Sequence, residues 1–222
     1  MTKHLRNEIE NLKRRFLSLS AAVEAGVHNA VKAIVERDVN LARKVIDDDS
    51  DIDRTEVEIE EECLKILALH QPVAIDLRFL ISVLKINNDL ERIGDLSSNI
   101  AEAAIFLSNN ERIEMPFDLV MMSDKVKSML KSSIDALVNL DAGLAHDVCF
   151  LDDEIDELHL EMYKIVENGI LENPRHMERL LRFLSASRQL ERIADHATNI
   201  AEDVIYMTEG EIFRHRVEDF QS

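Results

Sequence analysis

Residues 90–102 read LERIGDLSSNIAE and residues 190–202 read LERIADHATNIAE, so that nine of the thirteen positions are identical. In both copies the retained Glu, Asp, Asn and Glu stand at i, i+4, i+8 and i+11. A helix turns by about 100° per residue, so this spacing places the four polar side chains on one narrow stripe. A helix bundle needs only its apolar positions to repeat, and the repeated polar residues therefore indicate a shared chemical role. The sequence predicts a tandem repeat in which each half carries an acidic row on a helix.

The composition excludes several classes of protein. Hydrophobic residues make up 46% of the 222 residues, which is enough to build a core. The net charge of −18 argues against binding to nucleic acid and against electrostatic docking on anionic membranes. A membrane-spanning helix needs about 20 apolar residues, and no apolar run in the sequence approaches this length. The charged N-terminus lacks the apolar stretch of a signal peptide. We therefore expect a cytoplasmic protein that does not span a membrane.

The two cysteines, Cys63 and Cys149, do not occupy matching places in the repeat and show no metal-ligand spacing. We expect both to be reduced, partly buried thiols.

Six long amphipathic stretches are separated by Pro, Gly and Asn, with almost no strand pattern. Prolines follow the second and the fifth stretch, and the residue before a proline avoids helical geometry. Helices are expected over about 7–37, 40–70, 73–108, 117–139, 144–171 and 175–208. Short connections make sequential helices antiparallel. The sequence therefore predicts an all-α fold of two tandem, pseudo-symmetric three-helix bundles, residues 1–110 and 111–222.

A second acidic element lies near the start of the second helix of each half. Asp49 and Asp53 stand at i and i+4, and the corresponding positions in the second half are Asp152 and Asp156. Each half thus has one acidic pair on its second helix and one on its third, the latter being Glu91/Asp95 and Glu191/Asp195. Like charges at this spacing cost an isolated helix a few tenths of a kcal/mol. Their repetition therefore requires a compensating interaction.

The acidic stripe on the third helix runs back through Leu84, Leu80 and Leu77. This places the carboxylates in the bundle-facing seam or close to it. Partly desolvated carboxylates that face each other need protons, basic partners or cations, and a cation bridging four such groups meets the requirement most simply. We predict metal binding by Asp49, Asp53, Glu91, Asp95, Asp152, Asp156, Glu191 and Asp195.

Further polar residues on the same faces are candidates for additional ligands or for hydrogen bonds between packed helices. They are Glu56, Asn99, Glu102, His159, Asn199 and Glu202. Ligation by oxygen alone suits Mg, Mn, Ca or Fe. His159 stands where the first half has Glu56, and His196 follows Asp195, so that imidazole ligation would bring zinc or iron into the second half.

The doubled LERI-x-D-x3-NIAE signature, the preceding Asp-x3-Asp pairs and the six-helix layout resemble the PhoU family of phosphate-uptake regulators over essentially the whole chain. The resemblance implies that the eight carboxylates hold multinuclear clusters of iron or zinc. It also implies a cytoplasmic homodimer, peripheral at the inner membrane through its partners. Those partners are the ATPase of the high-affinity phosphate ABC transporter and a phosphate sensor histidine kinase, which the protein restrains when phosphate is plentiful.

Two other functions are compatible with the residues. One is a ferritin-like metal oxidase or store, although such proteins carry Glu-x-x-His on two helices and only Asp156-x-x-His159 approximates this pattern. The other is a metal-free interaction module, in which Arg92, Arg188 and Arg192 neutralise the acids. No nucleotide loop, nucleophile elbow or zinc-binding Cys/His motif is present, so we do not expect an enzyme.

Overall fold

Six long α-helices account for almost all of residues 3–209, the part of the chain that the computed structural model describes. The helices are α1 (Lys3–Glu36), α2 (Val39–His70), α3 (Ala74–Asn109), α4 (Leu119–Asn139), α5 (Ala142–Glu172) and α6 (Met177–Glu209), with a short 3-10 turn, η1 (Pro174–His176), before α6. The prediction of an all-α fold with six helices is confirmed. Residues 1, 2 and 210–222, which the predicted halves include, lie outside the described residues.

Aspartate caps fix the start of three helices. The Asp38 carboxylate accepts hydrogen bonds from the backbone N–H groups of Asn40 and Leu41, and Asp118 and Asp141 cap α4 and α5 in the same way. Such caps satisfy the free N–H groups of a first helical turn. The cap at Asp141 explains why α5 begins at Ala142, earlier than the expected residue 144.

The end of α2 follows from its sequence. His70 is the last helical residue, and Gln71 adopts the left-handed conformation with φ 45° while its N–H donates to the carbonyl of Leu67. Pro72 then prevents the helix from continuing. At the equivalent place in the second half, Pro174 opens η1, so that α6 begins at Met177 rather than at the expected residue 175.

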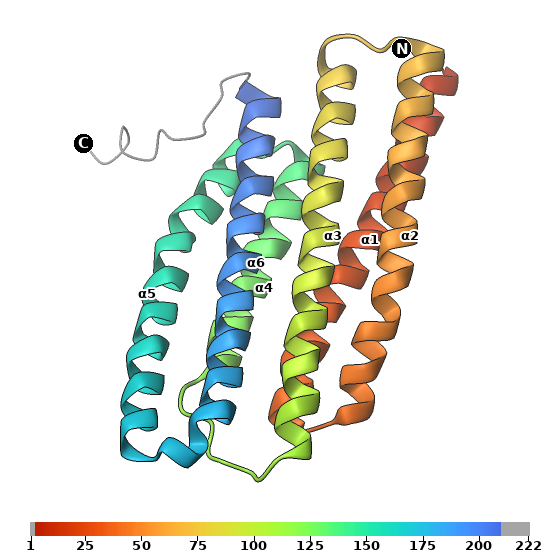
Figure 1. Ribbon diagram of the computed structural model, residues 1–222. Helices are drawn as coiled ribbons and strands as arrows, with labels where there is room; N and C mark the ends of the chain where they lie inside the picture. The colour runs from red at the N-terminus through yellow and green to blue at the C-terminus, as the bar shows by residue number, and fades with distance from the viewer. Residues whose placement is uncertain (1–2, 210–222) are drawn as a thin grey trace, which may run out of the picture.

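The two sets of three helices share one core (Figure 1). Helices α3 and α6 pack side by side in the middle of the molecule, with α1 and α2 outside α3 and with α4 and α5 outside α6. Two polar contacts cross from α3 to α6: Lys85 Nζ lies 2.9 Å from Asp203 Oδ1, and His196 Nδ1 lies 2.8 Å from Asp89 Oδ1. Both contacts lie within or next to the signature segments of α3 and α6, and they join the two halves at the centre of the fold.

The halves differ in the length of their first helix. Helix α1 has 34 residues and α4 has 21, so α1 has an N-terminal extension without a counterpart in the second half. This extension carries buried Leu5, Ile9 and Leu12 and packs along the far end of the first bundle.

Both cysteines are free, Cys63 being buried and Cys149 half-buried. Burial, followed by neighbouring carboxylates, raises the pKa of each thiol to about 12. Both are therefore protonated thiols; Cys149 is partly buried, as the sequence predicts, whereas Cys63 is completely buried. None of the described helices combines the length and the apolar character that a membrane span requires.

Candidate metal-binding site

Four carboxylates of the first half face each other across α2 and α3, and we call Asp49, Asp53, Glu91 and Asp95 the first acidic cluster. Partial burial and then the charges of Asp53 and Asp95 raise the pKa of Asp49. For Glu91, partial burial and the charges of Asp95, Asp53 and Asp49 raise the pKa, while Arg92 lowers it. Each helix thus places carboxylates where they repel those of the other. The predicted grouping of the two acidic pairs is present in the fold.

Asp49 is the most constrained member of the first acidic cluster. Its Oδ1 atom is buried near the hydroxyl of Ser98, but neither atom makes a hydrogen bond of ordinary geometry, so Ser98 assists Asp49 only weakly. Ser98 lowers the pKa of Asp49 only in part, because burial and like charges outweigh it. A buried carboxylate oxygen without a partner carries a desolvation penalty of about 1–3 kcal/mol or more. A cation beside Asp49 would remove this penalty.

The second acidic cluster consists of Asp152 and Asp156 on α5 with Glu191 and Asp195 on α6. Partial burial, Asp195 and Asp156 raise the pKa of Asp152 to about 6. Partial burial, Glu191 and Asp156 raise the pKa of Asp195 to about 6, against the lowering effect of His196 and Arg192. These carboxylates hold protons far more readily than ordinary aspartates. Burial, followed by the neighbouring carboxylates, therefore disfavours the charged form more strongly here than in the first half.

The clusters lie beside the core rather than inside it. Fully buried Ile86, Leu90 and Ile93 form the core-facing side of α3, whereas Glu91 and Asp95 are only half-buried. In the second half the Asp156 and Asp195 side chains are largely open to solvent, although neighbouring protein atoms still desolvate the Asp195 carboxylate in part, while Asp152 and Glu191 are half-buried. Each cluster thus lines an edge where two helices meet, and solvent ions reach it directly.

One residue on each third helix anchors the end of an acidic row, and sequence reasoning did not single it out. Fully buried Asn87 donates from Nδ2 to the backbone carbonyl of Glu56 at 2.9 Å and to its carboxylate at 3.0 Å. In the second half His159 Nδ1 lies 3.0 Å from Ser187 Oγ. Residues 56 and 159 are equivalent, as are 87 and 187. Each half therefore has a hydrogen-bonding contact between its second and third helix at the same place, made by different side chains.

The other predicted additional ligands are distributed along α3 and α6. Asn99 and Glu102 are exposed, and Asn199 and Glu202 are half-buried. The charge of Glu202 raises the pKa of Cys149, which places it beside α5. His196 directs Nδ1 to Asp89 of α3, so this ring nitrogen takes part in the contact between the halves.

Arginine partly neutralises the first acidic cluster. Arg92 Nε lies 3.3 Å from Glu91 Oε2, and a terminal nitrogen of Arg92 lies 3.3 Å from Asp95 Oδ2. Such exposed pairs contribute about 0–1 kcal/mol each. In the second half, within residues 3–209, no ion pair within 4 Å joins Arg192 to Glu191 or Asp195. Burial and the charge of Asp156 raise the pKa of Glu191, and the charges of Arg188 and Arg192 lower it, so arginine compensates the second cluster without the close ion pairs that Arg92 makes.

A cavity of about 260 Å³ opens beside Asp49, between α1 and α2. Asp48, Asp49 and Asp51 contribute to its lining, together with Thr55 and Ser97 and with apolar side chains, and the lining contains no Lys, Arg or His. This surface repels anions and suits water or a cation.

Ligand atoms converge most closely at a place that the sequence analysis missed. Within residues 3–209, His4, Glu8 and His70 form the one group of three or more His, Cys, Asp or Glu side chains whose ligand atoms all lie within 4.8 Å of one another. The carboxylates of the acidic clusters are spaced more widely and must draw together around an ion. The i, i+4 spacing of His4 and Glu8 was the available signal, but the contact with His70 depends on the fold.

The amino-acid sequence matches one family model and several described proteins over most of its length. The family model of the PhoU domain matches residues 16–104 and 119–204. The chain is 40% identical over 211 residues to the phosphate-specific transport system accessory protein PhoU homolog of Pseudomonas putida, covering 94% of this chain and 82% of that protein. It is 38% identical over 209 residues to the homolog from Aquifex aeolicus, covering 94% and 95%.

Solved structures agree with the sequence comparisons. The crystal structure of PhoU from Pseudomonas aeruginosa superposes with a TM-score of 0.89 at 38% identity, covering 93% of this chain and 99% of that chain. The phosphate transport system regulatory protein PhoU from Streptococcus pneumoniae gives a TM-score of 0.83 at 29% identity, covering 94% and 98%. These relatives are accessory and regulatory proteins, in agreement with the prediction that the chain is not an enzyme.

Proposed function

This chain belongs to the PhoU family of phosphate-transport accessory and regulatory proteins, and we propose that it is a cation-binding adaptor that restrains phosphate uptake and phosphate-starvation signalling when phosphate is plentiful. Its proposed partners are the ATPase of a high-affinity phosphate ABC transporter and a phosphate sensor histidine kinase. We place it on the cytoplasmic side of the inner membrane, held there by its partners, and as a homodimer. The names of the relatives support the phosphate-transport part of this proposal.

Cation binding rests on one observation: in each half, carboxylates from two helices are brought together at a partly buried edge, where burial and then their mutual repulsion raise their pKa values. A divalent ion between them would replace repulsion by attraction and would satisfy the unpartnered Oδ1 of Asp49. The residues that would hold it are the two acidic clusters, with Glu56 and His159 at the ends of their rows. The chemistry that the ion supplies is cross-linking of α2 to α3 and of α5 to α6.

The donor types bear on the identity of the metal. Carboxylate oxygens suit Mg, Mn or Fe, and carboxylates that draw together around the metal can bridge two ions. His159 would add an imidazole donor to the second cluster, which favours iron or zinc there. We propose multinuclear iron or zinc, with manganese or magnesium as the alternatives that oxygen ligation allows.

An adaptor that works through its shape needs rigid helices, and metal cross-links at the two outer helix pairs would provide them. The central contact between α3 and α6 already joins the halves through Asp89–His196 and Lys85–Asp203. Metal at the outer edges would fix α2 and α5 to this centre. Partner affinity is therefore expected to depend on the bound metal.

A metal-free interaction module is the second candidate, and the two contacts of Arg92 within the first acidic cluster favour it. In that case arginine and protons compensate the acids, and chelation leaves both stability and partner binding unchanged. Membership of the PhoU family removes the support for the ferritin-like alternative.

Partner binding by metal-loaded and metal-stripped protein tests the proposal. The tag-free chain is measured against the purified transporter ATPase and the cytoplasmic part of the kinase, beside Asp95→Ala/Asp195→Ala. Glu61→Ala/Glu157→Ala removes the same number of charges from exposed positions outside the clusters and serves as the control. We expect the metal-loaded wild type and the metal-loaded control to bind the two partners, and we expect neither the stripped protein nor Asp95→Ala/Asp195→Ala to bind them. Equal binding by stripped protein supports the metal-free module, and no binding to either partner contradicts the adaptor.

A further inference from the structure

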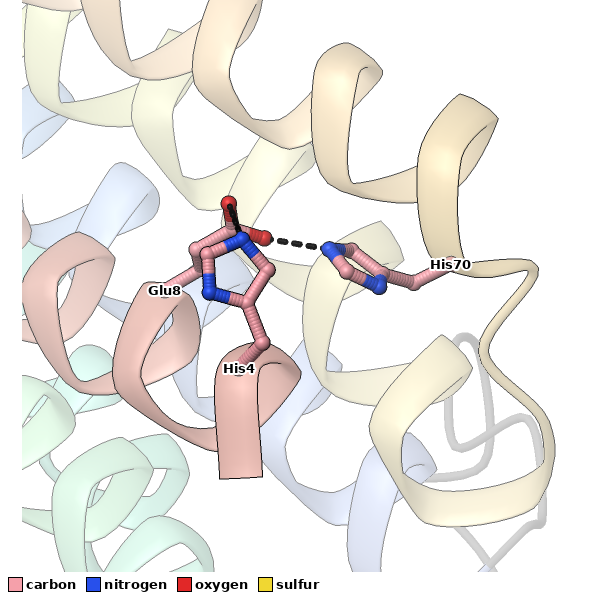
Figure 2. Close-up of side chains that lie close together, drawn as sticks. All are labelled: His4, Glu8 and His70. Atoms are coloured by element: carbon pink, nitrogen blue, oxygen red, sulfur yellow. Dashed lines mark hydrogen bonds and ion pairs between the residues drawn. The ribbon is translucent and has the colours of Figure 1, made fainter. Parts of the chain in front are cut away.

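A compact cluster of two histidines and one glutamate joins the start of α1 to the end of α2 (Figure 2). The Nε2 atom of His70 lies 2.5 Å from Glu8 Oε2, and the Nε2 atom of His4 lies 3.4 Å from Glu8 Oε1. The two imidazole rings meet edge to face with centroids 5.6 Å apart. Each ring thus directs one nitrogen to a different oxygen of the same carboxylate.

The fold brings these residues together from opposite ends of two helices. His4 and Glu8 stand one turn apart on the N-terminal extension of α1, and His70 is the last residue of α2. Glu8 and His70 are largely buried, with side chains 14% and 16% exposed, whereas the His4 side chain is 77% exposed. Packing therefore holds Glu8 and His70 in place, and His4 lies on the solvent side of the cluster.

Within residues 119–209, the described helices of the second half, no such cluster forms. Helix α4 begins at Leu119 and lacks the extension that carries His4 and Glu8. The residue equivalent to His70 is Asn173, whose Nδ2 contacts His176 at 3.2 Å. This arrangement is therefore specific to the first half and separate from the repeated acidic rows.

Two imidazoles and one carboxylate are a donor set suited to zinc and similar divalent transition metals. Zinc bonds such donors at about 2.0–2.2 Å, which places tetrahedral ligand atoms a little over 3 Å apart. The separation of 3.4 Å between His4 and Glu8 matches this, and His70 needs only a small shift to do so. We propose that His4, Glu8 and His70 bind one Zn²⁺-type ion, with an open position for water.

Such an ion would join the start of α1 to the end of α2. The α2–α3 connection begins directly after His70, at Gln71 and Pro72. Zinc at this place therefore clamps the first turns of α1 onto the end of the bundle that carries this connection. The clamp acts on helix pairing alone and is independent of the proposed adaptor function.

Zinc binding to the tag-free, full-length chain tests the proposal by equilibrium dialysis. Wild type is compared with His4→Ala, which alters an exposed side chain and leaves packing intact, and with His70→Gln. The control is His28→Gln, since His28 lies on α1 beside Lys127 and outside this cluster. Zinc-dependent shifts of the ring nitrogens in NMR spectra identify the histidines that act as ligands.

We expect His4→Ala and His70→Gln each to weaken one zinc site per chain by about tenfold or more. The control keeps this site, and the ring nitrogens of His4 and His70 shift on zinc addition. Asp95→Asn/Asp195→Asn also keeps it, so failure of the acidic clusters and failure of this site are distinguishable. Equal zinc binding in wild type, His4→Ala and His70→Gln would overturn the proposal and leave a hydrogen-bonded cluster.

Discussion

A methyl group on Gly94 of α3 would come within 2.8 Å of Asp49 Oδ1 on α2. The absence of a side chain at residue 94 therefore allows the carboxylate of Asp49 to lie against the backbone of α3. The same methyl group would meet Ile52 at 3.3 Å, so the surroundings on α2 leave little room. The second half has Ala194 at the equivalent position, which makes this close approach a property of the first acidic cluster.

Replacing Gly94 with alanine tests the role of this contact. We expect Gly94→Ala to displace the Asp49 carboxylate and to weaken cation binding in the first half. Global stability should change by less than about 1 kcal/mol, because the higher helix propensity of alanine contributes about 0.5–1 kcal/mol against the cost of the shift. Cation titration and urea unfolding measure the two effects separately. Ala194→Gly is the matched change in the second half, and unaltered binding by Gly94→Ala would show that Asp49 is not a ligand.

The pKa shifts in the second acidic cluster predict how the metal-free protein responds to pH. Asp152 and Asp195 have a folded-state pKa of about 6, against about 3.9 for an unfolded aspartate. The folded state therefore binds protons more readily, and the resulting stability is fully present below about pH 3.9 and lost as the pH rises through about 6.

We accordingly expect the melting temperature of metal-free wild type, compared with Asp152→Asn/Asp195→Asn, to rise as the pH falls from 7.5 to 5.5. The variant lacks both titrating groups and provides the baseline for the rest of the chain. Differential scanning calorimetry with a chelator present gives the comparison. Parallel curves for the two proteins would mean that burial and mutual repulsion do not raise the pKa values of these carboxylates in solution.

Asn87 is expected to contribute to both stability and site geometry. Asn87→Ala removes two hydrogen bonds to Glu56 and should destabilise the fold by about 1–2 kcal/mol. Released from Asn87, the Glu56 side chain gains freedom, so cation affinity in the first half should fall as well. Urea unfolding in chelator and cation titration measure these effects. Ser187→Ala is the corresponding variant in the second half, where the hydroxyl contacts His159. If Asn87→Ala is as stable as wild type and binds the cation normally, Asn87 does not position Glu56.

Direct phosphate binding is expected to require bound metal. The cavity beside Asp49 is lined by three aspartates and by no basic residue, and it therefore repels a free anion. A cation with an open coordination position would reverse this local charge. Isothermal titration with inorganic phosphate should show binding to metal-loaded protein only. If phosphate changes neither metal affinity nor partner affinity, sensing resides in the partners.

Local sequence signals account for the helices and for the acidic clusters. Periodicity and breakers such as Pro72 act within a few residues, and the repeated Glu91/Asp95 and Glu191/Asp195 pairs mark one helix face. How deeply each carboxylate is buried could not be predicted from the sequence, because it depends on how far each helix is rotated about its axis in the bundle. This rotation places Ile93 in the core and leaves Asp95 at its edge.

Contacts between distant residues were not accessible from the sequence. His70 meets Glu8 across 62 positions, and this contact depends on α1 beginning at Lys3 and on its register against α2. The pairing of Asn87 with Glu56 likewise depends on the register of α3 against α2. A buried asparagine on an apolar face was a visible signal, but its partner is fixed only by tertiary packing.

Metal content is the most direct test that the acidic clusters bind cations. Tag-free protein is loaded anaerobically with iron or zinc, dialysed and analysed for metal per chain, beside Asp95→Ala/Asp195→Ala and the charge-matched control Glu61→Ala/Glu157→Ala. We predict bound metal in wild type and control and a sharp decrease in the cluster variant, with any zinc at His4, Glu8 and His70 retained. Equal metal content in all three proteins, or none at the clusters after loading, would contradict cation binding there.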